Sequence, residues 1–456
     1  MEEIEEEIAS EILKNQRQDI EKRLAGLKEI KDARGPTAAI FHLKEEVVGK
    51  KKTGQEACTV VDPNTGNNVF DHEEIREVCL EYCANLLENF PPDKEYVLEN
   101  STTSLVHAVI MEESDHPDPI LTEDDFNNVV KRIQMKKKEK YKFFLQAGNG
   151  YRDAIFQLFS IVWQGEIKPD QWRNTTILQL YKGKGSANEL GNQRGLHLKM
   201  DIPKVFETLV VDKSKLLIIE KYSKFQIAMP GHQAQEHIFT LKSTIEFYNY
   251  IDKPIIIKLY NLSKFFYKEV LADCMNTLYS AGVKGKLYRL WHTLNCDTII
   301  QVNTAVGMSK KRETGANVGQ GSIGGSLVSA LNLDVGFQAQ FTASTAEVSY
   351  GSVRLQRLLY QDDAAKLSPD LSSAQAGNDK VSIIMKQKQL KLNLDKTVFI
   401  VARRNNKIQE IQLLLKENPL TIDGKAMKQK LSEKYLGEIM WTPSTCGESV
   451  GWTRSY

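Results

Sequence analysis

One tetrapeptide, Tyr360-Gln361-Asp362-Asp363, constrains this chain more than any other feature. Largely apolar segments stand on both sides of it, from Leu355 to Leu359 and from Ala364 to Leu367. The pattern predicts two short strands joined by a bend that carries two adjacent carboxylates. Their repulsion is costly unless divalent cations lie between them and a phosphate. We therefore expect this bend at a site that such cations and phosphates can reach.

The length and composition are those of a soluble globular protein. The chain has 456 residues, which is too long for one ordinary domain, and 41% of them are hydrophobic and 26% charged. No apolar run approaches the roughly 20 residues that cross a bilayer. The acidic start Met1-Glu2-Glu3 does not resemble a signal peptide. We expect an intracellular protein without a membrane partner, and the sequence does not distinguish nucleus from cytoplasm or predict an oligomeric state.

The charge and cysteine content exclude few classes of function. The formal net charge of +1 does not indicate a nucleic-acid binder, although a basic cleft can be balanced by acidic segments elsewhere. Basic runs stand at 50–52, 136–140 and 386–391, and such runs are usually solvated faces. Cys79 and Cys83 lie one helical turn apart without a second ligand pair nearby. We expect buried thiols in a reducing compartment rather than a zinc site.

The pattern of predicted secondary structure changes near residue 150. Before it, residues 1–36 read as a charged helical arm or linker, and residues 37–150 read as a mostly helical spacer that includes a helix from Glu73 to Leu87. After it, helices and strands follow closely. Tyr151 to Trp163 is expected to be helical, and Trp172 to Tyr181 to be a strand.

A buried strand is predicted in the second half. Ile255-Ile256-Ile257 with Leu259-Tyr260 is an apolar run of strand length. The apolar spacing of four from Phe266 to Leu278 predicts a single helix directly after it. Strand–helix units around a central hairpin favour an α+β layer of the split βαβ type.

Several short motifs support one family resemblance. From about Trp172 to Gly437 the chain resembles the reverse transcriptases of non-LTR (LINE-like) retrotransposons, in the motif order of that family. The elements that carry the resemblance, besides the paired Asp, are Lys182-Gly183-Lys184-Gly185, Asn192-Gln193-Arg194-Gly195 with Leu198, Gly319-Gln320-Gly321-Ser322, Leu390 to Thr397, and Lys434-Tyr435-Leu436-Gly437.

The resemblance implies a fold and a domain plan. It implies an α+β polymerase right hand, with fingers at 151–250 and a palm with a primer-grip hairpin at 251–440. It also implies that 441–456 is a truncated C-terminus without the helical thumb, and nothing in 1–150 resembles the endonuclease of such elements. The family pattern departs mildly at Gly324-Gly325-Ser326-Leu327, where Ser-Pro is usual.

The resemblance also assigns roles to individual residues. Asp362 and Asp363 are the expected catalytic carboxylates and ligands of Mg²⁺ or Mn²⁺. The expected partners are an RNA template, a DNA primer and deoxynucleoside triphosphates. The nucleotide- and template-binding residues that it implies are Lys182, Arg194, Phe266 as the steric gate against a ribose 2′-hydroxyl, Gln320, Gly321 and Lys396.

The pattern breaks at the third carboxylate. The family has Asp at the end of the buried strand, and here Asn261 stands at that position; the Asp that commonly follows the aromatic gate is replaced by Tyr267. A unit charge at ~4 Å is worth about 4 kcal/mol at an effective dielectric of ~20. A loss of that size slows a reaction on the order of a thousandfold. Neither Asp252 nor Glu269 looks able to replace the missing acid, because the first precedes the strand and the second is expected inside the helix.

We therefore expect a polymerase fold whose nucleotidyl transfer and metal binding are impaired. One alternative is a non-catalytic nucleic-acid-binding protein that keeps the fingers and palm surface. Another is the product of a decaying mobile element without a selected role. A viral RNA-dependent RNA polymerase fits less well, because such enzymes usually have Gly before the paired Asp, where this chain has Gln361.

Overall fold

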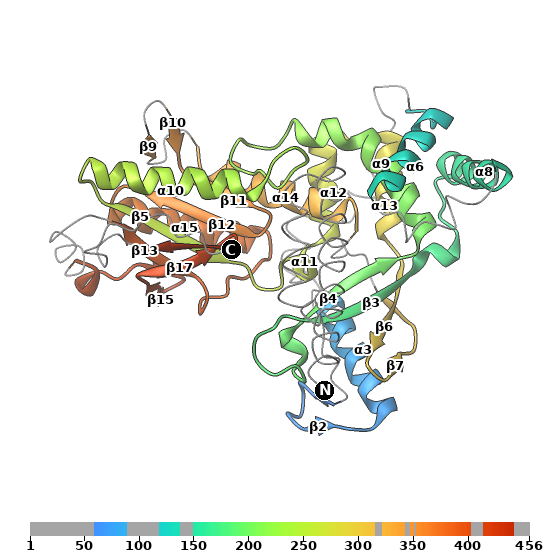
Figure 1. Cartoon of the computed structure of the whole chain (residues 1–456), viewed down its shortest axis with the longest axis horizontal. Coiled ribbons are helices and arrows are strands. Elements are labelled where there is room, and N and C mark those ends of the chain that lie inside the picture. Colours follow the sequence, from blue (N-terminus) through green and yellow to red (C-terminus); the bar gives the residue numbers. More distant parts are fainter. Residues whose placement is uncertain are drawn as a thin grey trace, which may run out of the picture.

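The computed structural model describes residues 59–88, 118–136, 149–314, 322–342, 347–350, 353–402 and 414–441. The expectations for 1–36 and 442–456, and those for Gln320 and Gly321, lie outside the described residues. The described part is a mixed α+β fold (Figure 1). Within it, no helix is long and apolar enough to cross a membrane.

A five-stranded sheet, here called the central sheet, occupies one end of the molecule. Its strand order is β11-β12-β5-β13-β16. Strands β11, β12, β5 and β13 pair antiparallel, and the short β16 pairs parallel with β13. The bounds are β5, Ile255–Asn261; β11, Arg357–Tyr360; β12, Asp363–Ser368; β13, Val398–Ala402; and β16, Lys428–Gln429.

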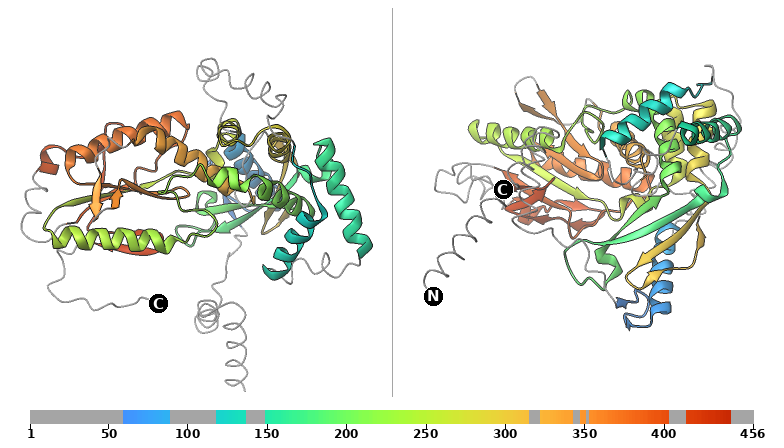
Figure 2. Two further views of the ribbon diagram at one scale, coloured as in Figure 1. Left: turned by 90° about the horizontal axis from the view of Figure 1, so that it is seen from above. Right: turned by 45° about the vertical axis from the view of Figure 1, so that its right-hand side comes forward.

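Helices cover both faces of the central sheet, as Figure 2 (left) shows. Helix α10 (Ala234–Tyr250) packs on one face, and α14 (Gly325–Gln340) and α15 (Leu371–Gln387) pack on the other. In β5 the side chains of 255, 257 and 259 join the α10 cluster, whereas Tyr260 joins the cluster beneath α14 and α15. A strand buried on both faces needs apolar residues at successive positions, which explains the apolar run that only Lys258 interrupts.

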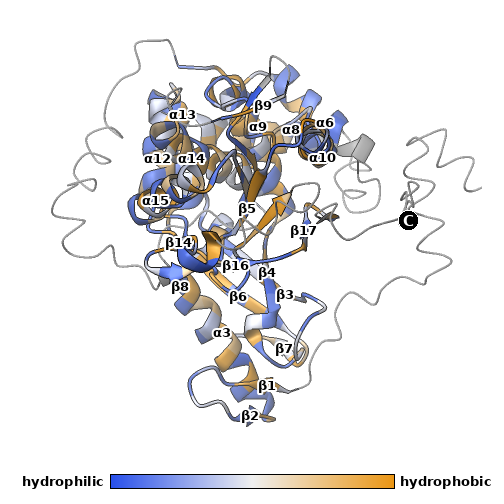
Figure 3. Cartoon of the chain, turned by 90° about the vertical axis from the view of Figure 1, so that its left-hand side faces the viewer, coloured by the Kyte–Doolittle hydropathy of each residue, from blue (hydrophilic) through white to orange (hydrophobic). Residues whose placement is uncertain are grey.

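A second sheet, with the order β4-β3-β6-β7 and β8 beside β6, lies beside the central one. Helix α3 (His72–Glu88) packs against it and carries both hydrophilic and hydrophobic stretches in Figure 3. The predicted helix 73–87 is thereby confirmed. The strands are β3, Asn174–Tyr181; β4, Gln193–Lys199; β6, Thr298–Thr304; β7, Gly307–Met308; and β8, Arg312–Thr314. Strand β3 begins at Asn174, two residues later than predicted, because Trp172 belongs to the 3-10 turn Asp170–Arg173.

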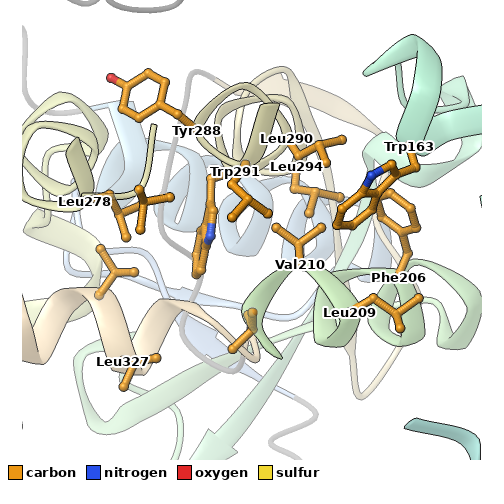
Figure 4. Close-up of a cluster of buried hydrophobic side chains, with 14 of the residues drawn as sticks. Trp163, Phe206, Leu209, Val210, Leu278, Tyr288, Leu290, Trp291, Leu294 and Leu327 are labelled. Atoms are coloured by element: carbon orange, nitrogen blue, oxygen red, sulfur yellow. The ribbon is translucent and has the colours of Figure 1, made fainter. Parts of the chain in front are cut away.

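A helical layer holds the largest apolar cluster, part of which Figure 4 shows. The indole nitrogen of Trp291 donates a hydrogen bond to Ser214 Oγ at 2.9 Å. A Cβ at Gly324 would lie 2.1 Å from the same indole ring, so only glycine fits there. The helices are α6, Glu123–Lys136; α8, Asn149–Gly165; α9, Asp201–Ile219; α12, Leu271–Ser280; and α13, Gly285–Asn295.

Short elements complete the described fold. The hairpin β17–β18 lies against the α10 face of the central sheet, where Tyr435 joins the apolar cluster. The two-stranded pairs are β1 (Val60–Val61) with β2 (Asn68–Val69), β9 (Val348–Tyr350) with β10 (Val353–Leu355), β14 (Thr421–Ile422) with β15 (Lys425–Ala426), and β17 (Ser432–Tyr435) with β18 (Glu438–Trp441). A further 3-10 turn covers Leu190–Asn192.

The helix predicted from Phe266 to Leu278 is wrong in one respect. The segment forms two helices, α11 (Phe265–Lys268) and α12, with Glu269 in an extended conformation between them. Glu269 is therefore not inside a helix. The four-residue apolar spacing does not mark one buried face: Phe266 packs against the cluster beneath α14 and α15, whereas Cys274 and Leu278 belong to the cluster of the helical layer.

Candidate functional site

The paired carboxylates stand at the tight turn between β11 and β12, as the apolar flanks predict. Tyr360 and Asp363 are opposite each other at the end of the ladder, and Gln361 and Asp362 form the bend. Gln361 has a φ of 55°, which is uncommon for a residue other than glycine. The turn therefore needs support from its surroundings.

A buried glutamine provides that support. Gln226 is 0% exposed, and its side chain accepts a hydrogen bond from Gln361 N at 3.1 Å and donates one to Gln361 O at 3.4 Å. Its neighbours Phe225 and Ile227 exchange backbone hydrogen bonds with Leu359. The segment thus extends the central sheet beside β11 and holds the turn. Nothing in the local sequence marks Gln226, because its partner is 135 residues away.

The end of β5 meets the same turn. Asn261, the last residue of β5, is the Cα partner of Asp363 in the antiparallel pair β12–β5. Its backbone is fixed: Asn261 N donates to Thr397 Oγ1 at 3.2 Å, and Asn261 O accepts from Asn393 N at 2.8 Å. Two carboxylates and one amide side chain are therefore brought to adjacent strand ends.

Burial and repulsion shape the electrostatics of the two carboxylates. Burial raises the pKa of Asp363 to about 6, and the neighbouring charge of Asp362 adds to this. Burial also raises the pKa of Asp362, although the charge of Arg194 opposes the shift. A group that bears positive charge would stabilise this pair.

Arg194, whose charge acts on Asp362, belongs to a group of positive side chains from separate segments. The pKa of the Lys182 ammonium is lowered by burial first, and then by the charges of Lys396, Arg194 and Lys264. The Nζ of Lys182 donates a hydrogen bond to Gly191 O at 2.9 Å. The structure thus brings together three of the residues that the resemblance assigns to the triphosphate.

Lys264 is the member of this group that sequence reasoning missed. It has a φ of 54° at the start of α11, and its Nζ lies 5.2 Å from the centre of the Tyr82 ring in α3. The ring carries partial negative charge on its face and stabilises the ammonium there. Its position three residues after Asn261 was a signal that could have identified it.

Phe266 lies in α11, the short helix that follows Asn261. Its ring stands 5.2 Å from that of buried Phe265 in an edge arrangement, and it packs partly buried against the cluster beneath α14 and α15. The gate role that the resemblance implies stays a prediction.

Tyr267, which replaces the Asp expected from the family pattern, makes specific contacts with β4. Its hydroxyl donates to Gly195 O in β4 at 2.9 Å, and its ring meets His197 edge-on at 5.9 Å. A Cβ at Gly195 would lie 2.0 Å from this hydroxyl. Tyr267 therefore joins α11 to β4 directly beside Arg194, and the missing side chain of Gly195 makes the contact possible.

No other acid takes the place of the missing carboxylate in the described segments. Glu269 is buried elsewhere, where it accepts hydrogen bonds from Cys274 Sγ at 2.8 Å and Asn332 Nδ2 at 3.1 Å, and burial raises its pKa to about 7. Asp252 precedes β5, whose seven residues span about 20 Å to Asn261. Across the described ranges, no group of three or more His, Cys, Asp or Glu side chains could hold a metal ion.

Two further expectations concern the cysteines and the last hairpin. Cys79 and Cys83 are buried in α3, as predicted, and burial raises the pKa of each thiol to about 12. Lys434 and Tyr435 end strand β17, and Leu436 and Gly437 form the turn to β18, both with positive φ.

Comparisons with known proteins find similar structures but no similar family or curated sequence. No protein-family model matches this chain, and no curated protein matches it. Among solved structures, telomerase from Candida albicans in complex with a fragment of telomeric RNA is similar, with a TM-score of 0.42 and 10% identity over 92% of this chain and 72% of that one. Apo telomerase from Candida tropicalis, truncated from its C-terminal domain, gives 0.41 and 10% over 92% and 89%. Likeness at these values supports no inference about this chain.

Proposed function

We propose that this chain is a reverse-transcriptase-like protein of the non-LTR retrotransposon type in which nucleotidyl transfer is impaired. In this proposal the central sheet with α10, α14 and α15 is the palm, and the second sheet is part of the fingers. The boundary expected at residue 250 changes accordingly, because α10 packs on the central sheet and β6 to β8 pair with β3 and β4 in the second sheet. The observation that carries the proposal is the pairing of Asp363 with Asn261, next to Asp362 at the turn. It puts an amide where this type of site requires a third carboxylate.

The donor set fits one divalent cation. Asp362 and Asp363 are hard oxygen donors, and their repulsion and burial favour a bound positive charge. Mg²⁺ is commonly held by one or two carboxylates together with substrate phosphates. When bound, such ions activate the primer hydroxyl and neutralise the triphosphate. The residues of the chain itself position the triphosphate through Lys182, Arg194 and Lys396.

A pair of cations fits poorly because Asn261 supplies only a neutral carbonyl oxygen. Losing one unit charge at ~4 Å costs about 4 kcal/mol of electrostatic stabilisation at an effective dielectric of ~20. We therefore expect extension at a rate on the order of a thousandfold below that of a site with three carboxylates.

Primer extension on an RNA template, with Mg²⁺ or Mn²⁺, tests this proposal. Asn261→Asp should raise the extension rate on the order of a thousandfold. Asn303→Asp is the matched control, because it adds the same charge at an exposed position of β6 in the second sheet. Robust extension by the wild-type protein, or equal rates in both variants, would contradict the proposal.

Only the single reversal should be made at first. Tyr267→Asp would remove the hydrogen bond to Gly195 and place a carboxylate beside a buried histidine ring. The double variant therefore changes the link between α11 and β4 as well as the charge of the site.

The second candidate is a non-catalytic nucleic-acid-binding protein that keeps the same surface. The positive group around Lys182 favours it, because phosphate contacts need cations and no catalysis. Binding of an RNA–DNA duplex should then weaken steeply with salt as counterions are released. Affinity that does not change with salt would remove this candidate.

A further inference from the structure

The turn that carries the paired carboxylates is held by a segment that itself needs an anchor. Residues 223–227, here called the support segment, contain Gln226, whose side chain bonds to the backbone N and O of Gln361. The same segment exchanges backbone hydrogen bonds with Leu359 in β11. It belongs to no helix and has one bridge to β11. Its position therefore depends on the contacts that it makes at its other end.

Asp334, in the middle of α14, provides that anchor. It is 0% exposed, and its two carboxylate oxygens accept hydrogen bonds from Ser223 N and Ser223 Oγ, both at 2.7 Å. Gln338 Nε2 donates to the same carboxylate at 3.0 Å. An ionised carboxylate accepts hydrogen bonds only, and its burial is costly unless donors meet it. These donors therefore fix the start of the support segment on α14.

Helix α14 also holds the residues that lead into the support segment. The hydroxyl of Tyr222 donates to Leu327 O, and Gln338 Nε2 donates to Lys221 O at 3.1 Å. Consecutive residues of the chain are thus bonded to α14 immediately before the segment pairs with β11. The support segment is a short link with α14 at one end and the turn at the other.

We propose that Asp334 is a positioning residue for the turn that bears the paired carboxylates, and that it acts through Ser223 and Gln226. The inference rests on the proposed function only in treating that turn as a site for a divalent cation. The hydrogen bonds of Asp334 run to Ser223 and Gln338, so its effect on the carboxylates passes along the support segment. Residues that orient metal ligands from outside the ligand set change metal affinity by about 10–100-fold when they are removed.

Three substitutions in α14 separate this role from a general contribution to stability. Asp334→Leu removes the acceptors of Ser223 and Gln338. Asp334→Asn keeps an acceptor for Ser223 N, and its amide can donate to Ser223 Oγ, so it should behave like the wild type. Asn332→Leu is the matched control, because it also replaces a buried polar side chain of α14 by leucine. Asn332 bonds to Thr277 and Glu269 and not to the support segment.

Hydrogen exchange, followed by mass spectrometry of peptides that cover 359–363, measures the turn directly. Asp334→Leu should speed exchange there about tenfold relative to Asn332→Leu, because the bonds between the support segment and the turn open more often. Gln226→Leu should speed it as well, and Asp334→Asn should not. Ser223→Ala removes one hydroxyl and should give a smaller increase; it replaces Asp334→Leu in the test if that variant does not fold. Circular dichroism checks the folding of each variant.

Mn²⁺ affinity, measured by electron paramagnetic resonance, tests the consequence for the carboxylates. Asp334→Leu should weaken Mn²⁺ binding about tenfold, whereas Asp334→Asn and Asn332→Leu should bind as the wild type does. The inference is overturned by equal exchange at 359–363 in Asp334→Leu and Asn332→Leu, or by Mn²⁺ affinity that is unchanged in Asp334→Leu. It is also overturned if Gln226→Leu speeds exchange and both folded Asp334→Leu and Ser223→Ala do not.

These outcomes separate the inference from the proposed function. If Asp334→Leu loosens the turn but Asn261→Asp gains no extension, the inference stands and the polymerase proposal fails. If Asn261→Asp gains extension and the turn exchanges equally in Asp334→Leu and Asn332→Leu, the polymerase proposal stands and the inference fails. Absence of Mn²⁺ binding to the wild-type protein would contradict the proposed cation site, and the exchange result would then decide the inference alone.

Discussion

Two regions of the central sheet carry charge where a strand interior is expected to be apolar, and they differ in how the charge is used. At the open end, Asp362 and Asp363 are partly exposed beside cations from other segments. In the interior, Arg357, Lys366 and Lys258 are cross-strand partners in β11, β12 and β5, and each is at most 2% exposed. The first region can meet a ligand, and the second cannot.

The interior row is stabilised by aromatic rings and carbonyl oxygens. Lys366 Nζ donates to Leu367 O at 2.9 Å and lies 5.4 Å from the centre of the Phe341 ring, while Lys258 Nζ donates to Ala374 O in α15. Burial lowers the pKa of Lys366 to about 7, and it lowers the pKa of Lys258 well below its ordinary value. The comparison teaches that a buried charge in this sheet is suppressed, whereas a charge at the strand ends is available for chemistry.

The largest expected effect is a loss of primer-extension rate when a carboxylate at the open end is removed. In the Asn261→Asp background, Asp363→Asn should reduce the rate of primer extension on the order of a thousandfold, because it again leaves two carboxylates. Lys366→Met in the same background should leave the rate unchanged, since the interior row does not reach the turn. Equal losses in the two variants would show that the regions are not functionally distinct.

The difference between the regions also explains what the sequence could predict. The turn at Asp362 and the strand that ends at Asn261 could be located because their signals are local: a short apolar run, a tight bend and the spacing of neighbouring motifs. The interior row of Arg357, Lys366 and Lys258 could not be predicted. Only the strand register shows that Lys366 lies opposite Lys258, and that register is not visible in the local sequence. Gln226 and the Tyr267–Gly195 contact also depend on tertiary proximity between distant segments.

Lys366→Met should increase the free energy of unfolding by about 3 kcal/mol at pH 6. The pKa of Lys366 is lowered to about 7 in the folded state, so between pH 7 and the ordinary lysine range the unfolded chain binds more protons. Stability of the wild-type protein should therefore rise with pH across that window. Below pH 7 the folded protein carries the buried charge, and the full free-energy cost of burying it applies there. The variant should show a smaller slope in urea denaturation at a series of pH values.

A control separates the charge from the packing. Lys425→Met removes an exposed lysine and should leave both the stability at pH 6 and the pH slope unchanged. An unchanged slope in Lys366→Met as well would contradict a neutralised interior lysine.

The contact between Tyr267 and Gly195 links the open end to the second sheet. Gly195→Ala should lower the free energy of unfolding by about 2 kcal/mol, because the new Cβ would lie 2.0 Å from the tyrosine hydroxyl. In a Tyr267→Phe background the cost should fall, since the nearest remaining ring atom is 3.3 Å from that Cβ. A double-mutant cycle in urea measures this coupling. Additive effects of the two changes would exclude a direct contact.

The smallest expected effect concerns the backbone of the turn itself. Gln361 has a φ of 55° and is held there through its backbone N and O by Gln226. Gln361→Gly keeps both hydrogen bonds and removes the steric cost of the left-handed conformation, but it also makes the unfolded chain more flexible. We expect a net gain of about 0.5 kcal/mol in the free energy of unfolding. Thermal denaturation of matched samples measures it, with Gln387→Gly at the end of α15 as a control that should destabilise because its backbone is helical. Destabilisation by Gln361→Gly would mean that the glutamine side chain itself supports the turn. The two carboxylates would then depend on Gln361 as well as on Gln226.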